Sequence, residues 1–336
     1  MKVIAILLAV SVSFFPAPLA AQYKSEFKMS IVVSQETTWG RAAIRFADAI
    51  KYRTQGRIKV TNYFNGRLFA GEQATEFQLL QQGSADFAIG STINWSAQVK
   101  ELNLFALPFI FPSYSAVDAV QAGEPGKHLF NLIEQKGVVP IAWGENGFRE
   151  VTNSKRPIRR PEDLVGLNIR VPPMPILLET FQALGASPVS MNWDAAQTAF
   201  RQGKVDGQEN PVALIIPYQI YAVQPYVTLW RYAIDPTILA VSAKTWMSLS
   251  PEDRKSLQLV GSIIMIEQKI EARLGLENAM TVVDVLEKIY SMQVTQLSPA
   301  EVNVFREKTR SVYDNWANYI GIDLVRSAEA IVRIEK

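Results

Sequence analysis

The sequence predicts an α/β fold of two domains. Short stretches of alternating apolar residues are separated by stretches in which apolar residues recur every third or fourth position, so strands alternate with helices and a largely parallel sheet is expected. This order is interrupted at residues 144–147 and at Asp235-Pro236, which indicates two crossings between domains. From 251 to 289 the apolar pattern is helical, and at about 1.5 Å per residue such a helix is longer than one domain.

Residues 1–21 have the composition of a secretory signal peptide. Lys2 precedes an apolar run over 3–15 that is too short to span a bilayer, and small residues follow up to Ala21. Cleavage there would make Gln22 the first residue of the mature protein. The sequence contains no cysteine, which excludes disulfides and a lipid anchor on cysteine. We therefore expect a soluble periplasmic protein that does not itself span the membrane.

The composition argues against several function classes. The net charge is only +2 and no long basic run occurs, so nucleic acid is not an expected partner. The single histidine, His128, is expected to be an ordinary helix residue, and no nucleophile elbow, Walker loop or dinucleotide fingerprint is present. Asp206 and Glu209 do not have the spacing of a calcium loop, and Asp206-Gly207 is better interpreted as a turn. No catalytic residue, metal or cofactor is predicted.

The first predicted domain contains four strands. They cover 27–33, 58–63, 85–89 and 138–143, and the helices between them cover 40–52, 72–82 and 116–136, the last broken near Gly123. The apolar stretch 102–111 contains Pro108 and is expected to be a buried loop or short strand. After the crossing at 144–147, a strand over 148–152 begins the second domain.

The stretch 166–211 carries the candidate ligand-binding residues. A strand over 167–171 ends at Pro172-Pro173, a helix follows over 176–183, a strand over 188–191, a helix from its N-cap Asn192 to 201, and a strand over 205–209. Ligand crevices form at the carboxyl ends of such strands. Two strand ends and one helix start are expected to place Arg170, Trp193 and Asn210 at the same edge of the sheet. A guanidinium, an indole and a carboxamide suit a planar organic acid.

The rest of the chain is predicted to be mainly helical. Helices are expected over 212–221, with a kink at Pro217, and over 251–289, 299–319 and 323–331. Short strands are expected over 226–229, 238–242 and 294–297.

Several sequence blocks are typical of one family. GLNIRVPP, ALGASPV and KVDGQENP follow one another in the order and spacing of the periplasmic substrate-binding proteins of tripartite ATP-independent (TRAP) transporters. GRLFAGEQ, LPFIFPSY and NGFREVTNSKRPI extend the match over nearly the whole mature chain. The resemblance implies a two-lobed periplasmic binding protein fold with hinge strands and a long domain-spanning helix. Domain I would be 22–145 plus 236–275, domain II 146–235 plus 276–336, and the ligand cleft would lie between them.

The resemblance also implies roles for single residues. Arg170 matches the arginine that holds the ligand carboxylate, a task that suits the planar guanidinium fork. Arg149 matches the second cation of that site, Asn210 its amide, and Trp193 the aromatic residue that covers the ligand.

The sequence departs from the family pattern at two places. Ala195, Ala196 and Gln197 stand where many relatives have Glu, a β-branched residue and Tyr, and Ser91 and Asn94 stand where sialic-acid-binding relatives have Glu and Arg. These differences argue against sialic acid as the ligand. Further candidates for the distal part of the pocket are Glu72, Trp95, Glu145 and Trp230.

The resemblance implies a monomeric receptor, not an enzyme, that captures an organic acid and delivers it to membrane permease subunits. Two alternatives remain open from the sequence. One is a receptor for an ATP-driven importer, and the other is a periplasmic lyase or hydrolase that acts on a carboxylate.

Overall fold

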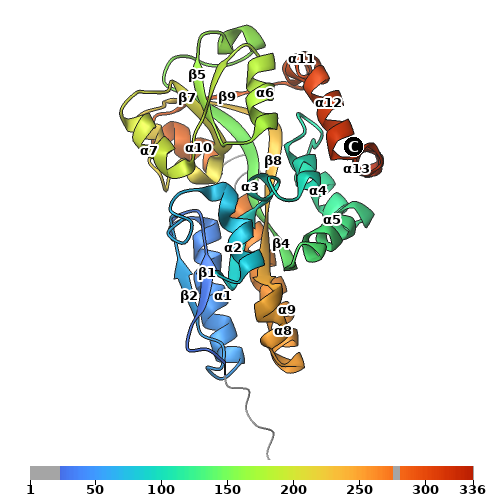
Figure 1. Cartoon of the computed structure of the whole chain (residues 1–336). Coiled ribbons are helices and arrows are strands. Elements are labelled where there is room, and N and C mark those ends of the chain that lie inside the picture. The colour runs from blue at the N-terminus through green and yellow to red at the C-terminus, as the bar shows by residue number, and fades with distance from the viewer. Residues whose placement is uncertain (1–22, 275–280, 336) are drawn as a thin grey trace, which may run out of the picture.

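The computed structural model describes residues 23–274 and 281–335 of the 336-residue chain. The predicted signal peptide, 1–21, lies outside the described residues. The described strands are β1 (Phe27–Ser30), β2 (Val60–Tyr63), β3 (Phe87–Ser91), β4 (Val138–Asn153), β5 (Asn168–Val171), β6 (Ser187–Ser190), β7 (Gly207–Pro211), β8 (Tyr226–Ser242) and β9 (Gln293–Gln296). They form one sheet in the order β2-β1-β3-β8-β4-β7-β5-β6, with β9 beside β8 (Figure 1). The predicted α/β class is confirmed.

Two long antiparallel strands, β4 and β8, run through the middle of the molecule (Figure 1). At one end β3 pairs with residues 237–241 of β8, and β1 and β2 continue the sheet as parallel strands. At the other end β7 pairs with residues 149–153 of β4, and β5 and β6 follow in parallel. The pair of long strands therefore joins two groups of strands that are parallel within themselves.

The predicted interruptions at 144–147 and 235–236 fall within these strands. The chain stays in the sheet at both places, because β4 and β8 remain paired and only their register shifts, between Glu145 and Gly147. Gly147 has φ +127°, a conformation that residues with a side chain rarely adopt. The sheet is thus continuous across the crossing, and the division of the chain into two domains remains a proposal.

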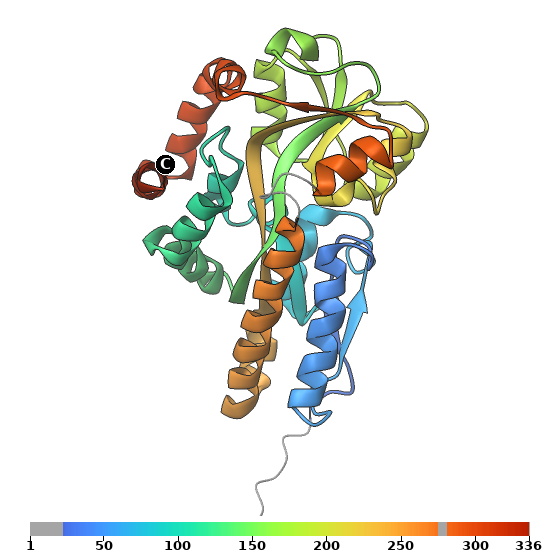
Figure 2. The same ribbon diagram turned by 180° about the vertical axis from the view of Figure 1, so that it is seen from behind.

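Helices cover the sheet in groups. Near β1–β3 lie α1 (Thr38–Arg53), α2 (Glu76–Gln82), α8 (Ala243–Ser248) and α9 (Pro251–Arg273), and near β5–β7 and β9 lie α6 (Pro175–Ala183), α7 (Trp193–Arg201) and α10 (Thr281–Lys288). The short α3 (Thr92–Trp95) follows β3. At the side lie α4 (Tyr114–Ala122) and α5 (Glu124–Gln135), next to α11 (Pro299–Lys308), α12 (Arg310–Ile320) and α13 (Ile322–Ile334) (Figures 1 and 2).

The long helix is shorter than predicted. α9 lies beside β4 and α1 (Figure 2) and ends at Arg273, because Leu274 has ψ 122°. Residues 275–280 lie outside the described part, and α10 begins at Thr281. The predicted helix over 299–319 is likewise two helices that meet at Thr309.

Two further segments differ from the sequence prediction. Residues 212–221 hold only the 3₁₀ turns Val212–Leu214 and Ile220–Ala222, with Pro217 between them and Gln219 in the left-handed region at φ +55°. The apolar segment expected as loop or strand begins with a 3₁₀ helix, Lys100–Ala106, whose last five residues are buried. No helix among the residues placed by the structure is both long enough and apolar enough to cross a membrane.

Candidate functional site

A small pocket lies where the carboxyl ends of β3, β5 and β7 approach β4 and β8. Its cavity volume is about 30 Å³. The lining residues come from both groups of strands and from the start of α7: Val32, Val33, Trp39, Gln73, Ser91, Ile93, Asn94, Asn146, Arg149, Arg170, Pro172, Trp193, Asn210, Leu214 and Asp235. Six of the residues predicted from the sequence are thus brought together: Ser91, Asn94, Arg149, Arg170, Trp193 and Asn210.

Arg170 is a buried cation that has no carboxylate partner in the described part of the chain. It lies near the end of β5, and its side chain is among the largest in the protein to be fully buried, at 1% exposure. Nε and Nη2 both donate to the carbonyl oxygen of Met191, at 2.9 and 2.6 Å. Burial lowers the pKa of Arg170, although the charge of Glu209 opposes this. The outer edge of the guanidinium, formed by Nη1 and the second hydrogen of Nη2, remains available for an anion.

Trp193 fixes one wall beside this cation. It is the first residue of α7, and the guanidinium of Arg170 lies 5.4 Å from its ring centroid, a distance typical of a cation–π contact. The ring is buried, and Nε1 has no hydrogen-bond partner among the described residues. A buried indole N–H normally finds an acceptor, so this one is available for a ligand oxygen.

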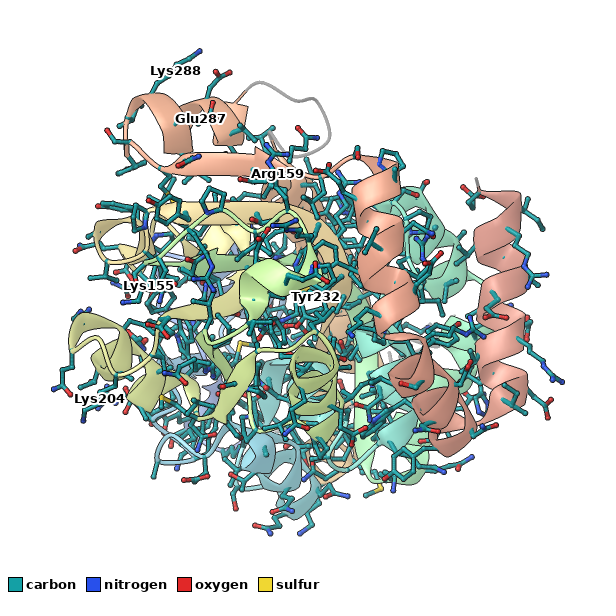
Figure 3. The ribbon with its side chains drawn as sticks, turned by 90° about the horizontal axis from the view of Figure 1, so that it is seen from above. Lys155, Arg159, Lys204, Tyr232, Glu287 and Lys288 are labelled. Carbon is teal, nitrogen blue, oxygen red and sulfur yellow. The ribbon has the colours of Figure 1, made fainter. Side chains whose placement is uncertain are left out.

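Arg149 is a second buried cation, but protein groups already occupy its donors. Nε and Nη2 bind the carboxylate of Glu209, Nη2 also donates to Asn210 Oδ1 at 3.0 Å, and Nη1 faces Asp235 Oδ2 at 3.3 Å. Burial favours a lower pKa for Arg149, yet the charge of Glu209 outweighs it and the pKa is raised. The hydroxyl of Tyr232 also donates to Glu209. In Figure 3, Tyr232 lies in the interior of the molecule, whereas Lys204, Glu287 and Lys288 lie at its periphery.

Asp235 is the centre of a hydrogen-bond network at the crossing of β4 and β8. Its carboxylate accepts from Ser91 Oγ at 2.6 Å, Asn146 Nδ2 at 2.8 Å, Arg149 Nη1 at 3.3 Å, Thr92 Oγ1 at 3.3 Å and the backbone N–H of Ile93 at 3.4 Å. The side chain is 2% exposed. These donors hold a carboxylate in one orientation inside the pocket.

Three hydrogen bonds connect the segment before α2 with the start of α7 and with α3. Gln73 Oε1 accepts from the backbone N–H of Trp193 at 2.8 Å, and Gln73 Nε2 donates to Asn94 Oδ1 at 2.7 Å. Asn192 Nδ2 donates to Glu72 Oε2 at 2.9 Å. Through Gln73, these contacts link the start of α7 to α3, two parts of the pocket lining that are far apart in the sequence.

The remaining predicted candidates lie outside the pocket lining. Trp95 is a core residue whose Nε1 donates to Glu76, and Trp230 packs among aromatic rings. Glu145 is buried on β4 but pairs with Arg273 at the end of α9. The carboxylate of Glu72 accepts the hydrogen bond from Asn192 described above. Sequence reasoning missed Gln73, Asn146 and Asp235, for which no local pattern gives a signal.

The free guanidinium edge of Arg170 gives this pocket one place where an anion could bind. Arg149, Arg170 and Asp235 are its ionisable lining residues, and Arg149 and Asp235 are held by protein partners. The described residues contain no group of three or more His, Asp or Glu side chains arranged to hold a metal ion. His128 is exposed on α5.

Comparison with known proteins gives consistent matches. The family model described as "Bacterial extracellular solute-binding protein, family 7" matches residues 29–319. The C4-dicarboxylate-binding periplasmic protein DctP of Shewanella loihica is 28% identical over 98% of this chain and 95% of its own length. An uncharacterized protein of Sinorhizobium fredii, y4mM, is 30% identical over 85% of this chain, which spans only 51% of that longer protein.

Among solved structures, a TRAP periplasmic solute-binding protein of Ralstonia eutropha H16 is 47% identical. The similarity covers 93% of this chain and 99% of that one, with a TM-score of 0.90. That protein was crystallised with (S)-2-acetolactate bound.

Proposed function

Because the chain belongs to family 7 of the bacterial extracellular solute-binding proteins, we propose that it captures an organic acid outside the cytoplasm and passes it to the membrane subunits of a TRAP-type secondary transporter. The signal peptide predicted at 1–21 would direct it to the periplasm. Arg170 holds the ligand carboxylate in this proposal, and Trp193, Asn210, Asn94 and Ser91 surround the ligand.

The observation that carries the proposal is the buried guanidinium of Arg170, which forms no ion pair with any described residue. A guanidinium stays protonated, and a buried cation without an anion is unfavourable by several kcal/mol. Met191 orients the group through one edge of the fork but supplies no charge. A ligand carboxylate at the free edge would form two parallel, charge-assisted hydrogen bonds and give Arg170 an ion-pair partner.

The relatives support a carboxylate ligand. Acetolactate, bound to the Ralstonia protein, is a carboxylate, and the name of the Shewanella protein states C4-dicarboxylate binding. An enzyme is less well supported, because a general base needs a free acceptor near the substrate, whereas Asp235 already accepts hydrogen bonds from five donors.

A thermal-shift screen against a library of carboxylic acids tests this function. A true ligand at about 100 times its Kd should stabilise the protein by about 2.7 kcal/mol. Amides of the same acids serve as controls, since they lack the charge that Arg170 would bind. If no carboxylate raises the melting temperature of ligand-free protein, the proposed function is wrong.

A further inference from the structure

We propose that the ligand carries a single carboxylate and a compact apolar tail, and that Asp235 excludes dicarboxylates. This inference rests on the proposed function, since it concerns the same pocket. It separates this chain from relatives named for C4-dicarboxylates, such as the Shewanella protein.

The first support is the charge balance of the pocket. Of its two cations, Arg149 already faces two carboxylates, those of Glu209 and Asp235. Only Arg170 has a free guanidinium edge, and this edge is matched by one carboxylate. A second ligand carboxylate would find no unpaired cation among the pocket-lining residues that the structure describes.

The second support is the fixed position of Asp235. Ser91, Asn146 and Arg149 hold its oxygens, together with Thr92 and the N–H of Ile93, so the carboxylate cannot turn out of the pocket. Asp235 lines the same pocket as Arg170. A second carboxylate on a ligand held by Arg170 would therefore lie near Asp235, and like charges placed together in a buried site repel by several kcal/mol.

The third support is the character of the remaining walls. Apart from the polar groups described above, the pocket is lined by apolar or aromatic side chains, namely Val32, Val33, Trp39, Ile93, Pro172 and Leu214. These side chains can pack favourably against methyl and methylene groups of a ligand, but they provide no hydrogen bond or opposite charge for a charged group. The unpartnered Nε1 of Trp193 can donate to one neutral oxygen of the ligand, such as a hydroxyl or oxo group.

Two acids with the same heavy-atom skeleton test the inference. 2-Hydroxy-4-methylpentanoate and malate differ only in that an isopropyl group replaces the second carboxylate. We expect calorimetry on ligand-free protein to show that malate binds at least about 100-fold more weakly, since about 2.7 kcal/mol of repulsion suffices for this. 3-Methylbutanoate and malonate form a second, smaller pair with the same difference.

A variant then assigns the cause. Asp235→Asn removes the negative charge but keeps the size of the side chain. It should reduce the ratio of the Kd of malate to the Kd of 2-hydroxy-4-methylpentanoate by about tenfold or more. The matched control is Asp314→Asn on the exposed face of α12, which should leave the ratio unchanged. If Asp235→Asn does not fold, the comparison on the parent protein still decides the ligand class.

The outcomes separate the two proposals. If malate binds as tightly as its isostere, this inference is overturned and the receptor function stands. If a folded Asp235→Asn variant keeps the full difference, Asp235 is not the excluding residue. If neither these acids nor any other carboxylate binds, the receptor function fails and this inference fails with it.

Discussion

Replacing Arg170 with methionine should abolish binding and yet leave the ligand-free protein at least as stable as before. Methionine has a similar length and fills the same space without the charge. Most substitutions of a fully buried side chain destabilise a protein. For Arg170→Met we expect no loss of stability, because Arg170 has no carboxylate partner in the described structure.

The magnitudes follow from the contacts. Without Arg170, the ligand carboxylate would be buried unpaired, which should cost about 2–5 kcal/mol, or a loss of affinity of about 30- to 5,000-fold. In the ligand-free protein the carbonyl of Met191 loses its two donors, at a cost of about 1–3 kcal/mol. The buried charge that disappears was worth several kcal/mol of unfavourable desolvation, so the stability should stay level or rise.

Two measurements on the same protein check this prediction. Urea unfolding gives the stability of the ligand-free variant, and calorimetry with a cognate acid gives its affinity. Arg170→Lys should also bind poorly, because an ammonium keeps the charge but cannot form the planar paired contact. Arg159→Met, at an exposed arginine, is the control and should bind normally. If folded Arg170→Met binds within threefold of the parent, Arg170 is not the carboxylate clamp.

Three further predictions concern stability and motion. Arg149→Met should lower the unfolding free energy by about 3–5 kcal/mol, because Glu209 and Asp235 would be left buried without their cation; a loss below about 1 kcal/mol in urea unfolding would contradict this. Burial raises the pKa of Glu76 and of Glu150 from 4.5 to about 8, so the folded protein retains protons that the unfolded chain releases. Stability should therefore fall as the pH rises from about 5 to 8, by up to about 1.4 kcal/mol per pH unit for each group. Glu76→Gln should remove the contribution of Glu76 to this decrease of stability with pH. If thermal melts between pH 5 and 8 show the same decrease for the variant as for the parent, the raised pKa of Glu76 is refuted. A saturating ligand should reduce the radius of gyration in small-angle scattering, since it contacts residues on both sides of the pocket and favours the closed form; an unchanged radius with ligand bound would argue against closure.

Local sequence patterns predicted most of the elements around the pocket. The strand that ends at Pro172-Pro173 is β5, and the helix expected after Asn192 is α7. Asn192 itself makes no capping hydrogen bond and binds Glu72 instead. Proline and glycine act within a few residues, so their effects can be read without knowledge of the fold.

Long-range pairing was beyond the reach of such patterns. Asp235-Pro236 was interpreted as a crossing between domains that separates two short strands, whereas the pairing of β8 with β4 keeps both residues inside one strand. The same pairing brings Asp235 to Arg149, and the register of β4 against β7 brings Glu209 there as well. The saturation of Arg149 by protein carboxylates is therefore a property of the sheet register, which the sequence alone does not reveal.

The continuous strands β4 and β8 also determine which parts of the site can travel. Points near a rotation axis move least, and a closing motion that bends β4 and β8 at the register shift between Glu145 and Gly147 would have its axis there. Asp235 pairs with Gly147 and Arg149 follows two residues later, so both lie almost on that axis. Arg170 and Trp193 on one side, and Gln73 and Asn94 on the other, lie on the arms. The open receptor would thus keep Arg149 and Asp235 hydrogen-bonded to each other while Arg170 and Trp193 are apart from Gln73 and Asn94, so that an incoming acid meets Asp235 before the pocket encloses it.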